Sequence, residues 1–271
     1  MKNGKDTDFY KEVIYKYIDL IYRKEQDIIN FPPKEEWEIR PHKMNTEIHL
    51  QQIKLVTFSA RLNILIASYS KGSTKEELRS QFSEAVKVMA EVWDRRITKV
   101  YHGKKQEEYD QYKLNPFIYI VQMFSLAILL DVPKKEFIIL VNLIDKDNIK
   151  DRLIEYFISQ QLKDRKPIKA ESYKRYLLIP KLFRKLVDTA YEPQAEKAIT
   201  DIDTFLKKEW IKIPKNYFIN LNLKDIPGYE VKSGFVGLWA FEVAAVVKIK
   251  ALDDSSFREN RFYPDRLMQE E

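Results

Sequence analysis

Residues 60–89 read ARLNILIASYSKGSTKEELRSQFSEAVKVM and contain the signal that decides the fold class. Apolar side chains recur three or four positions apart on both sides of Gly72, which is the spacing of one buried helix face. Glycine adopts the left-handed conformation that ends many helices, and Ser73 followed by Glu76 predicts a capping box at the start of the next helix. The stretch therefore predicts two antiparallel helices joined by a short turn.

The same periodicity extends over most of the chain. It predicts further helices over residues 9–29, 45–70, 116–131, 134–143, 150–161, 194–208 and 233–252, and one over 170–190 that is broken near Pro180. Residues 101–110 and 211–229 are expected to be loops, and no segment shows the alternation typical of a strand. The sequence thus predicts an all-α, bundle-like body of antiparallel helices. We expect an N-terminal half, 1–112, to pack against a C-terminal half, 113–271.

Composition argues against several classes of protein. The 271 residues include 6 glycines and no cysteine, which disfavours glycine-rich phosphate loops and excludes disulfides and thiolate metal sites. The three histidines form no zinc motif, and Glu230-Val231-Lys232 lacks the strand-borne aspartate that nuclease chemistry requires. We see no secretory signal and no apolar run long enough to span a membrane. We therefore predict a cytoplasmic protein that is not an enzyme and holds no cofactor or metal.

Charge is unevenly distributed along this chain, whose formal net charge is +6. Residues 163–185 carry nine Lys or Arg against two acids, whereas residues 225–271 carry nine acids against six bases. Residues 25–47 carry six acids and three bases. Separate acidic and basic faces select partners by charge. The basic stretch, with Tyr173 and Tyr176 interleaved, keeps nucleic-acid binding open as an alternative function.

Two stretches of the sequence carry a resemblance to a known family. The first is residues 60–89 with their Tyr-Ser-x-Gly turn; the second is GLWAFEVAAVVKIKALDDSSF, residues 237–257, followed by Tyr-Pro-Asp-Arg-Leu at 263–267. With FSLAILL at 124–130 between them, they resemble the polymorphic nuclease immunity (PoNi) family. The resemblance implies a helical, non-enzymatic inhibitor that binds and neutralises a cognate DNase toxin delivered between bacteria. The oligomeric state, a homodimer included, stays open.

The net positive charge fits this resemblance poorly. An inhibitor that covers a DNA-binding cleft is often acidic, because it competes with phosphate for basic residues. Either the acids of this chain gather on one face, or the inhibitor binds the toxin away from its cleft.

The acids in the motifs have both structural and functional interpretations. Glu242 lies in an apolar stretch, so we expect it to point inward to an Arg, a Tyr or a backbone amide; the alternative exposes it in a toxin-binding groove. Asp253 and Asp254 are expected to cap a turn or to meet a basic partner. The residues that we assign to the scaffold are Trp239, Phe241, Glu242, Tyr263, Asp265 and Gly72. The residues that we expect to contact the toxin are Asp253, Asp254, Glu259, Glu35, Glu36 and Glu38.

Overall fold

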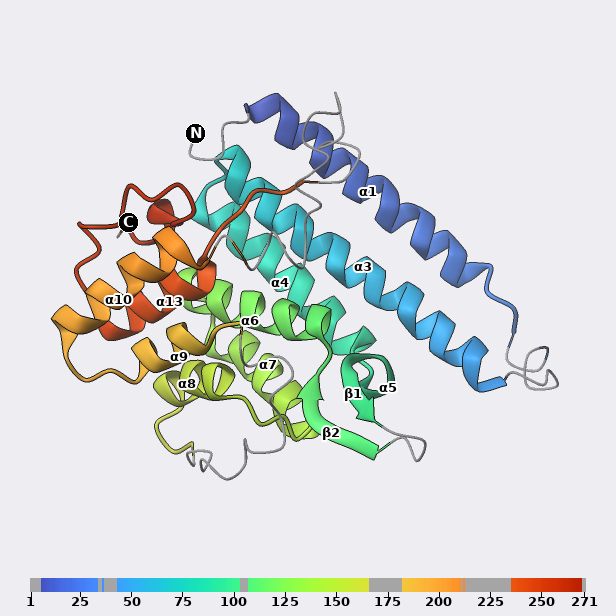
Figure 1. Ribbon diagram of the computed structural model, residues 1–271. Coiled ribbons are helices and arrows are strands. Elements are labelled where there is room, and N and C mark those ends of the chain that lie inside the picture. The colour runs from blue at the N-terminus through green and yellow to red at the C-terminus, as the bar shows by residue number, and fades with distance from the viewer. Residues whose placement is uncertain are drawn as a thin grey trace.

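The structure, a computed structural model, describes residues 6–33, 36, 43–102, 107–165, 182–210, 212 and 235–269. These residues form a multi-helix body with one two-stranded sheet at its edge (Figure 1). Its principal elements are α1 (Thr7–Ile29), α3 (Lys43–Lys71), α4 (Lys75–Val92), α5 (Arg95–Thr98), β1 (Lys99–His102), β2 (Glu107–Tyr112), α6 (Leu114–Leu129), α7 (Lys134–Lys146), α8 (Arg152–Gln161), α9 (Arg184–Ala190), α10 (Ala195–Lys208) and α13 (Phe241–Lys250). The predicted all-α class is confirmed, with the small sheet as an exception.

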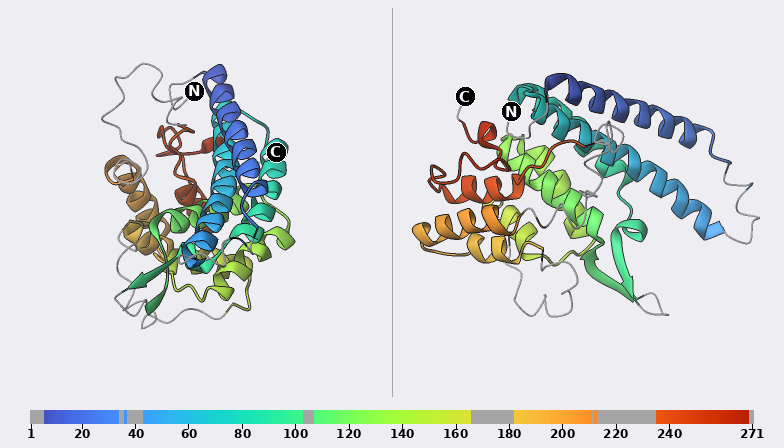
Figure 2. Two further views of the ribbon diagram at one scale, coloured as in Figure 1. Left: turned by 90° about the vertical axis from the view of Figure 1, so that its right-hand side faces the viewer. Right: turned by 45° about the horizontal axis from the view of Figure 1, so that its top comes forward.

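The long helices α1 and α3 lie side by side along one edge of the molecule, as Figures 1 and 2 both show. Asp6 is the N-cap of α1, and its side chain accepts a hydrogen bond from the backbone amide of Phe9 at 2.8 Å. Tyr10 and Val13 form the buried face of α1 and pack with Ala67 of α3. This small apolar cluster is separate from the main core, so α1 is attached to the body chiefly through α3.

The turn between α3 and α4 contains the predicted capping box one residue further along the chain. Thr74, not Ser73, is the N-cap: its side chain accepts from the amide of Glu77, and the Glu77 carboxylate accepts from the amide of Thr74. Glu77, not Glu76, is therefore the second member of the box. Gly72 has a φ of 106°, a conformation that other residues rarely adopt, and this explains the glycine at the end of α3.

The capping box yields a first prediction. Replacing Thr74 with Ala should lower the free energy of unfolding by about 1 kcal/mol, because an amide at the start of α4 loses its acceptor. Replacing Ser73 with Ala should cost about 0.5 kcal/mol or less, since Ser73 is not the N-cap and its side-chain hydrogen bond goes to the exposed Glu77 carboxylate. Urea denaturation of both variants measures the difference. Equal losses of unfolding free energy in the two variants would indicate that Ser73 serves as the N-cap.

The core lies around α6, which is buried along most of its length and packs against α13, α7 and α8. One continuous cluster of buried apolar side chains includes residues from both predicted halves, from Phe58 to Leu267, so the halves are packed together. An ion-pair group adds to this packing: the Asp131 carboxylate lies 2.7 Å from Lys248 Nζ and 3.1 Å from Lys75 Nζ. A division of the chain at residue 112 stays a prediction.

Two segments differ from the sequence-based expectation. The expected loop at 101–110 contains an antiparallel hairpin, in which β1 pairs with β2 with Tyr101 opposite Glu108. The helix expected over 233–252 spans only Phe241–Lys250, and residues 235–240 have no regular secondary structure. Parts of two other predictions, residues 170–181 of the broken helix and most of the 211–229 loop, lie outside the described residues.

Candidate partner-binding surfaces

The sequence motifs meet where the C-terminal segment crosses the α3–α4 turn. The Trp239 indole Nε1 donates to Ser70 Oγ at 2.7 Å, and Ser70 Oγ donates to the backbone oxygen of Val236 at 2.6 Å. The Tyr69 ring lies edge-on to the rings of Trp239 and Phe241, with centroids 4.8 and 5.5 Å away. These contacts explain why residues 235–240 are not helical: a helix there would remove Trp239 from Ser70.

Arg266 makes a further contact with the end of α3 at this junction. Its guanidinium lies over the Tyr69 ring, 4.5 Å from the centroid, and donates to the backbone oxygen of Tyr69. A Cβ at Gly72 would lie 3.7 Å from the same guanidinium. Tyr263 is buried against Phe257, and Asp265 begins the short 3₁₀ helix Asp265–Leu267 that carries Arg266. Of the residues that we assigned to the scaffold, Trp239, Phe241 and Gly72 lie at this junction, and Tyr263 and Asp265 lie in the segment that carries Arg266.

The junction yields a second prediction. Replacing Arg266 with Ala should lower the free energy of unfolding by about 2 kcal/mol, because both the ring contact and a charged hydrogen bond to the Tyr69 oxygen are lost. Arg261 lies over the Phe262 ring at 4.5 Å and is the matched control for a ring contact alone. Its replacement with Ala should cost about 1 kcal/mol or less. Thermal unfolding separates the two, and a larger loss at Arg261 would contradict the assignment.

Glu242 points inward, as the structural interpretation requires. Its carboxylate accepts a hydrogen bond from Trp210 Nε1 at 2.5 Å, in a site where the Glu242 side chain is only 4% exposed. Burial raises the pKa of Glu242 to about 7, and hydrogen bonds from its own backbone amide and from Trp210 offset only part of that shift. The Trp210 partner was not predicted, because it lies 32 positions earlier and no local pattern links the two.

The predicted contact residues have different environments. Asp253 is exposed and caps a turn by accepting from the backbone amide and hydroxyl of Ser255, at 3.0 and 2.8 Å. Asp254 is buried and bonded to the Arg258 guanidinium, so its carboxylate is not on the surface that a partner would meet. Glu259 and Glu36 are exposed, and Glu35 and Glu38 lie outside the described residues.

The exposed predicted contacts lie near opposite ends of the molecule. Asp253 and Glu259 follow α13, whose first residue packs on Tyr69 at the C-terminal end of α3. Glu36 precedes the N-terminal end of α3, and a helix of 29 residues is about 40 Å long. Figure 1 shows the N-terminal end of α3 and α13 on opposite sides of the molecule. The two sites are therefore separate surfaces, and the toxin contact predicted from sequence cannot be one compact acidic patch.

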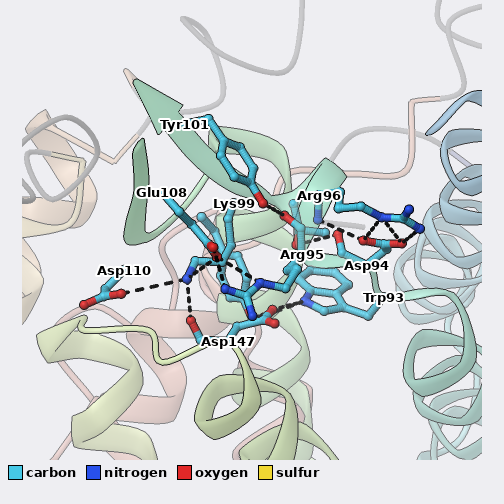
Figure 3. Close-up of polar contacts among 11 residues, drawn as sticks. Trp93, Asp94, Arg95, Arg96, Lys99, Tyr101, Glu108, Asp110 and Asp147 are labelled. Atoms are coloured by element: carbon cyan, nitrogen blue, oxygen red, sulfur yellow. Dashed lines mark hydrogen bonds and ion pairs between the residues drawn. The ribbon is translucent and has the colours of Figure 1, made fainter. Parts of the chain in front are cut away.

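A buried polar cluster lies beneath the hairpin (Figure 3). Asp147 Oδ2 accepts from Trp93 Nε1 at 3.1 Å and from the Tyr112 hydroxyl at 2.8 Å. Lys99, which is 2% exposed, donates to the backbone oxygen of Asp147 at 2.6 Å and forms an ion pair with Glu108 at 2.7 Å. These polar groups satisfy one another, and the cluster fastens the hairpin to α7.

The basic stretch at 163–185 is only partly described, since residues 166–181 lie outside the described ranges. Two of its described bases are paired with acids: Arg165 with Asp145 and Glu155, and Lys185 with Glu209. Among the described residues, no group of three or more His, Asp or Glu side chains is placed to hold a metal ion. No described helix is both long enough and apolar enough to cross a bilayer.

Comparison with known proteins agrees with the resemblance seen in the sequence. Residues 4–142 match the family model of the PoNe immunity protein (PoNi) N-terminal domain, and residues 149–267 match that of the PoNi C-terminal domain. No curated protein and no solved structure matched the chain. The two matched segments leave only a short interval between them and together cover nearly the whole sequence. The chain therefore belongs to the PoNi family of PoNe immunity proteins.

Proposed function

We propose that this protein binds a cognate DNase toxin and neutralises it by covering its catalytic or DNA-binding face. The observation that carries the proposal is the match of both halves to the immunity-protein family. The action is that of a binding protein rather than of an enzyme, and it takes place in the cytoplasm of the cell that is protected.

The inhibition is steric and electrostatic. A nuclease holds its substrate through basic groups that contact phosphates, and a protein seated over those groups excludes DNA. A rigid inhibitor serves this purpose well, because little freedom is lost on binding. The junction at Tyr69, Ser70 and Arg266 and the continuous core supply such rigidity.

The test is survival on co-expression. A candidate nuclease toxin is induced in a sensitive host, with this protein, without it, and with a non-cognate family member. Rescue of the host by this protein, and not by the non-cognate family member, supports a specific immunity pair. In vitro, an equimolar amount of protein should abolish DNA cleavage by the purified toxin. Full cleavage at equimolar protein would refute the proposal, whereas binding of the protein to DNA itself at low salt would favour the nucleic-acid alternative.

A further inference from the structure

The outward side of α1 carries a row of large apolar side chains. Tyr15, Ile18, Tyr22 and Ile29 are 69%, 49%, 61% and 71% exposed, and we call these four residues the α1 outer face. At 3.6 residues per turn, they fall within an arc of about 60° on the helix. Among the described residues, the large hydrophobic side chains that are exposed comprise these four and Tyr191. The exposed apolar surface is thus concentrated on one helix.

Such a row is unusual on a protein that functions alone. Single exposed apolar residues are common, but an aligned set rimmed by polar groups marks an interaction site. Tyrosine is among the residues that contribute most to binding energy at interfaces, since it offers a large rigid ring at low entropic cost. The buried face of α1 is accounted for by Tyr10, Val13 and Ala67, so the outer face is a second apolar surface of the same helix.

The rim of the α1 outer face is acidic. Among the exposed residues from Asp6 to Asn30, six acids stand against two bases: Asp6, Asp8, Glu12, Asp19, Glu25 and Asp27 against Lys11 and Arg23. Including the half-buried Lys16 and Lys24, acids still outnumber bases by two. Four of these acids form ion pairs, Asp8 with Lys11, Asp19 with Arg23, Asp27 with Lys24 and Glu25 with Arg61 of α3, so the excess of negative charge is small. The whole chain has a net charge of +6, so this helix differs in sign from the average of the molecule. A partner that is complementary to this helix is basic.

We propose that the α1 outer face, with its acidic rim, is the surface that docks on the basic, DNA-binding face of the toxin; this inference rests on the proposed function. The Tyr15 and Tyr22 rings pack against the aliphatic stems and guanidinium groups of basic residues. The exposed Glu12 competes with DNA phosphate for the same cations. Exposed Glu36 follows α1 in the chain, whereas Asp253 and Glu259 follow α13. A net basic chain thereby inhibits through an acidic helix.

The test uses the full chain and the purified nuclease toxin against which this protein rescues the host. Protein is titrated into a DNA-cleavage reaction, and the concentration for half-inhibition is measured. The Tyr15→Ala, Tyr22→Ala double variant should raise that concentration at least about 30-fold. Glu12→Lys should slow association about 10-fold at low salt and less at high salt. The matched controls Tyr191→Ala and Glu84→Lys, on the exposed side chains of another region, should stay within about 3-fold of wild type.

Each outcome decides the inference. Because the four side chains are exposed, the α1 variants should unfold at the wild-type temperature, and loss of inhibition then reports on binding. Unchanged inhibition by the α1 variants, or a loss confined to Asp253→Lys and Glu259→Lys, overturns the inference and leaves the proposed function intact. If the wild-type protein is a dimer, and the tyrosine variant is monomeric but still inhibits, the α1 outer face is an interface between two copies of this chain. That outcome also overturns the inference. A wild-type chain that does not inhibit refutes the proposed function and the inference together.

Discussion

Replacing Glu242 with Gln should increase the free energy of unfolding by about 3 kcal/mol at pH 8. Burial raises the pKa of Glu242 from 4.5 to about 7, so at pH 8 the folded protein contains an ionised carboxylate in an apolar site. Glutamine has nearly the same shape and keeps an oxygen that accepts from Trp210 Nε1. It removes the buried charge and retains the hydrogen bond.

The sign of the pH dependence follows from the raised pKa. Below the unfolded-state pKa of 4.5, Glu242 is protonated in both states and its contribution is at its maximum. As pH rises from 4.5 to about 7, only the unfolded chain releases the proton, and the stability contributed by this group is lost; above pH 7 the loss levels off. The advantage of Glu242→Gln should therefore be only a few tenths of a kcal/mol at pH 4 and reach its full value at pH 8. Denaturant titrations of both proteins at the two pH values measure it.

Glu242→Ala provides the contrast. It removes the acceptor of the buried Trp210 indole and leaves a cavity, which should cost about 3 kcal/mol at pH 4. Glu242→Gln should raise the stability at pH 8, and Glu242→Ala should lower it at pH 4. Neither variant should change the affinity of the folded protein for the toxin to a matching degree. A pH-independent difference between wild type and Glu242→Gln would show that the carboxylate has an ordinary pKa. A loss of affinity larger than the loss of stability would move Glu242 into the interface.

Asp147→Ala should lower the free energy of unfolding by about 3 kcal/mol, because the buried Tyr112 hydroxyl loses its acceptor, Trp93 Nε1 keeps only the Tyr112 hydroxyl at 3.1 Å, and a small cavity is left. Trp93 Nε1 and the Tyr112 hydroxyl both donate to Asp147 Oδ2, and water does not reach them. The hairpin should loosen first, since Lys99 and Tyr112 belong to its two strands. Urea denaturation measures the total loss, and hydrogen exchange of the strand amides locates it.

Asp145 is the matched control for Asp147. It lies two positions earlier, is half exposed, and pairs with Arg165, which keeps Glu155 as a second partner when Asp145 is removed. Asp145→Ala should therefore cost less than about 1 kcal/mol. Similar losses for the two variants would mean that the buried cluster does not hold the hairpin.

Sequence periodicity predicted most helices because each has one buried face, and the spacing of that face is a local property. The core helix at 116–131 and the pair joined at Gly72 are both present. Features set by distant contacts were missed. The hairpin at 99–112 is rich in charge and resembles a loop, but ion pairs among Arg95, Lys99 and Glu108 link its strands. Residues 235–240 are apolar enough to continue a helix, yet Trp239 binds Ser70 instead.

The candidate site shows the same limit. Neither aspartate of the 253–254 pair can be identified from the dipeptide as the buried one; the Arg258 four positions after Asp254 was the usable signal. The α1 outer face was visible as a second apolar row at spacings of three, four and seven, beside the row that is buried. It was missed because a single row suffices to predict an amphipathic helix, and only the packed structure shows which row is covered.

The contact between Arg266 and Tyr69 has a consequence for the timing of synthesis. Its partners are 197 positions apart, and those of the Trp239–Ser70 bond are 169 apart. Contacts of such separation form late, because the intervening chain must first be brought together. This closure can form only after the ribosome has translated past Arg266, and a chain truncated before that residue lacks it. An N-terminal fragment that stops short of Arg266 therefore cannot fasten residues 235–267 to the end of α3 in this way, however well its own helices pack.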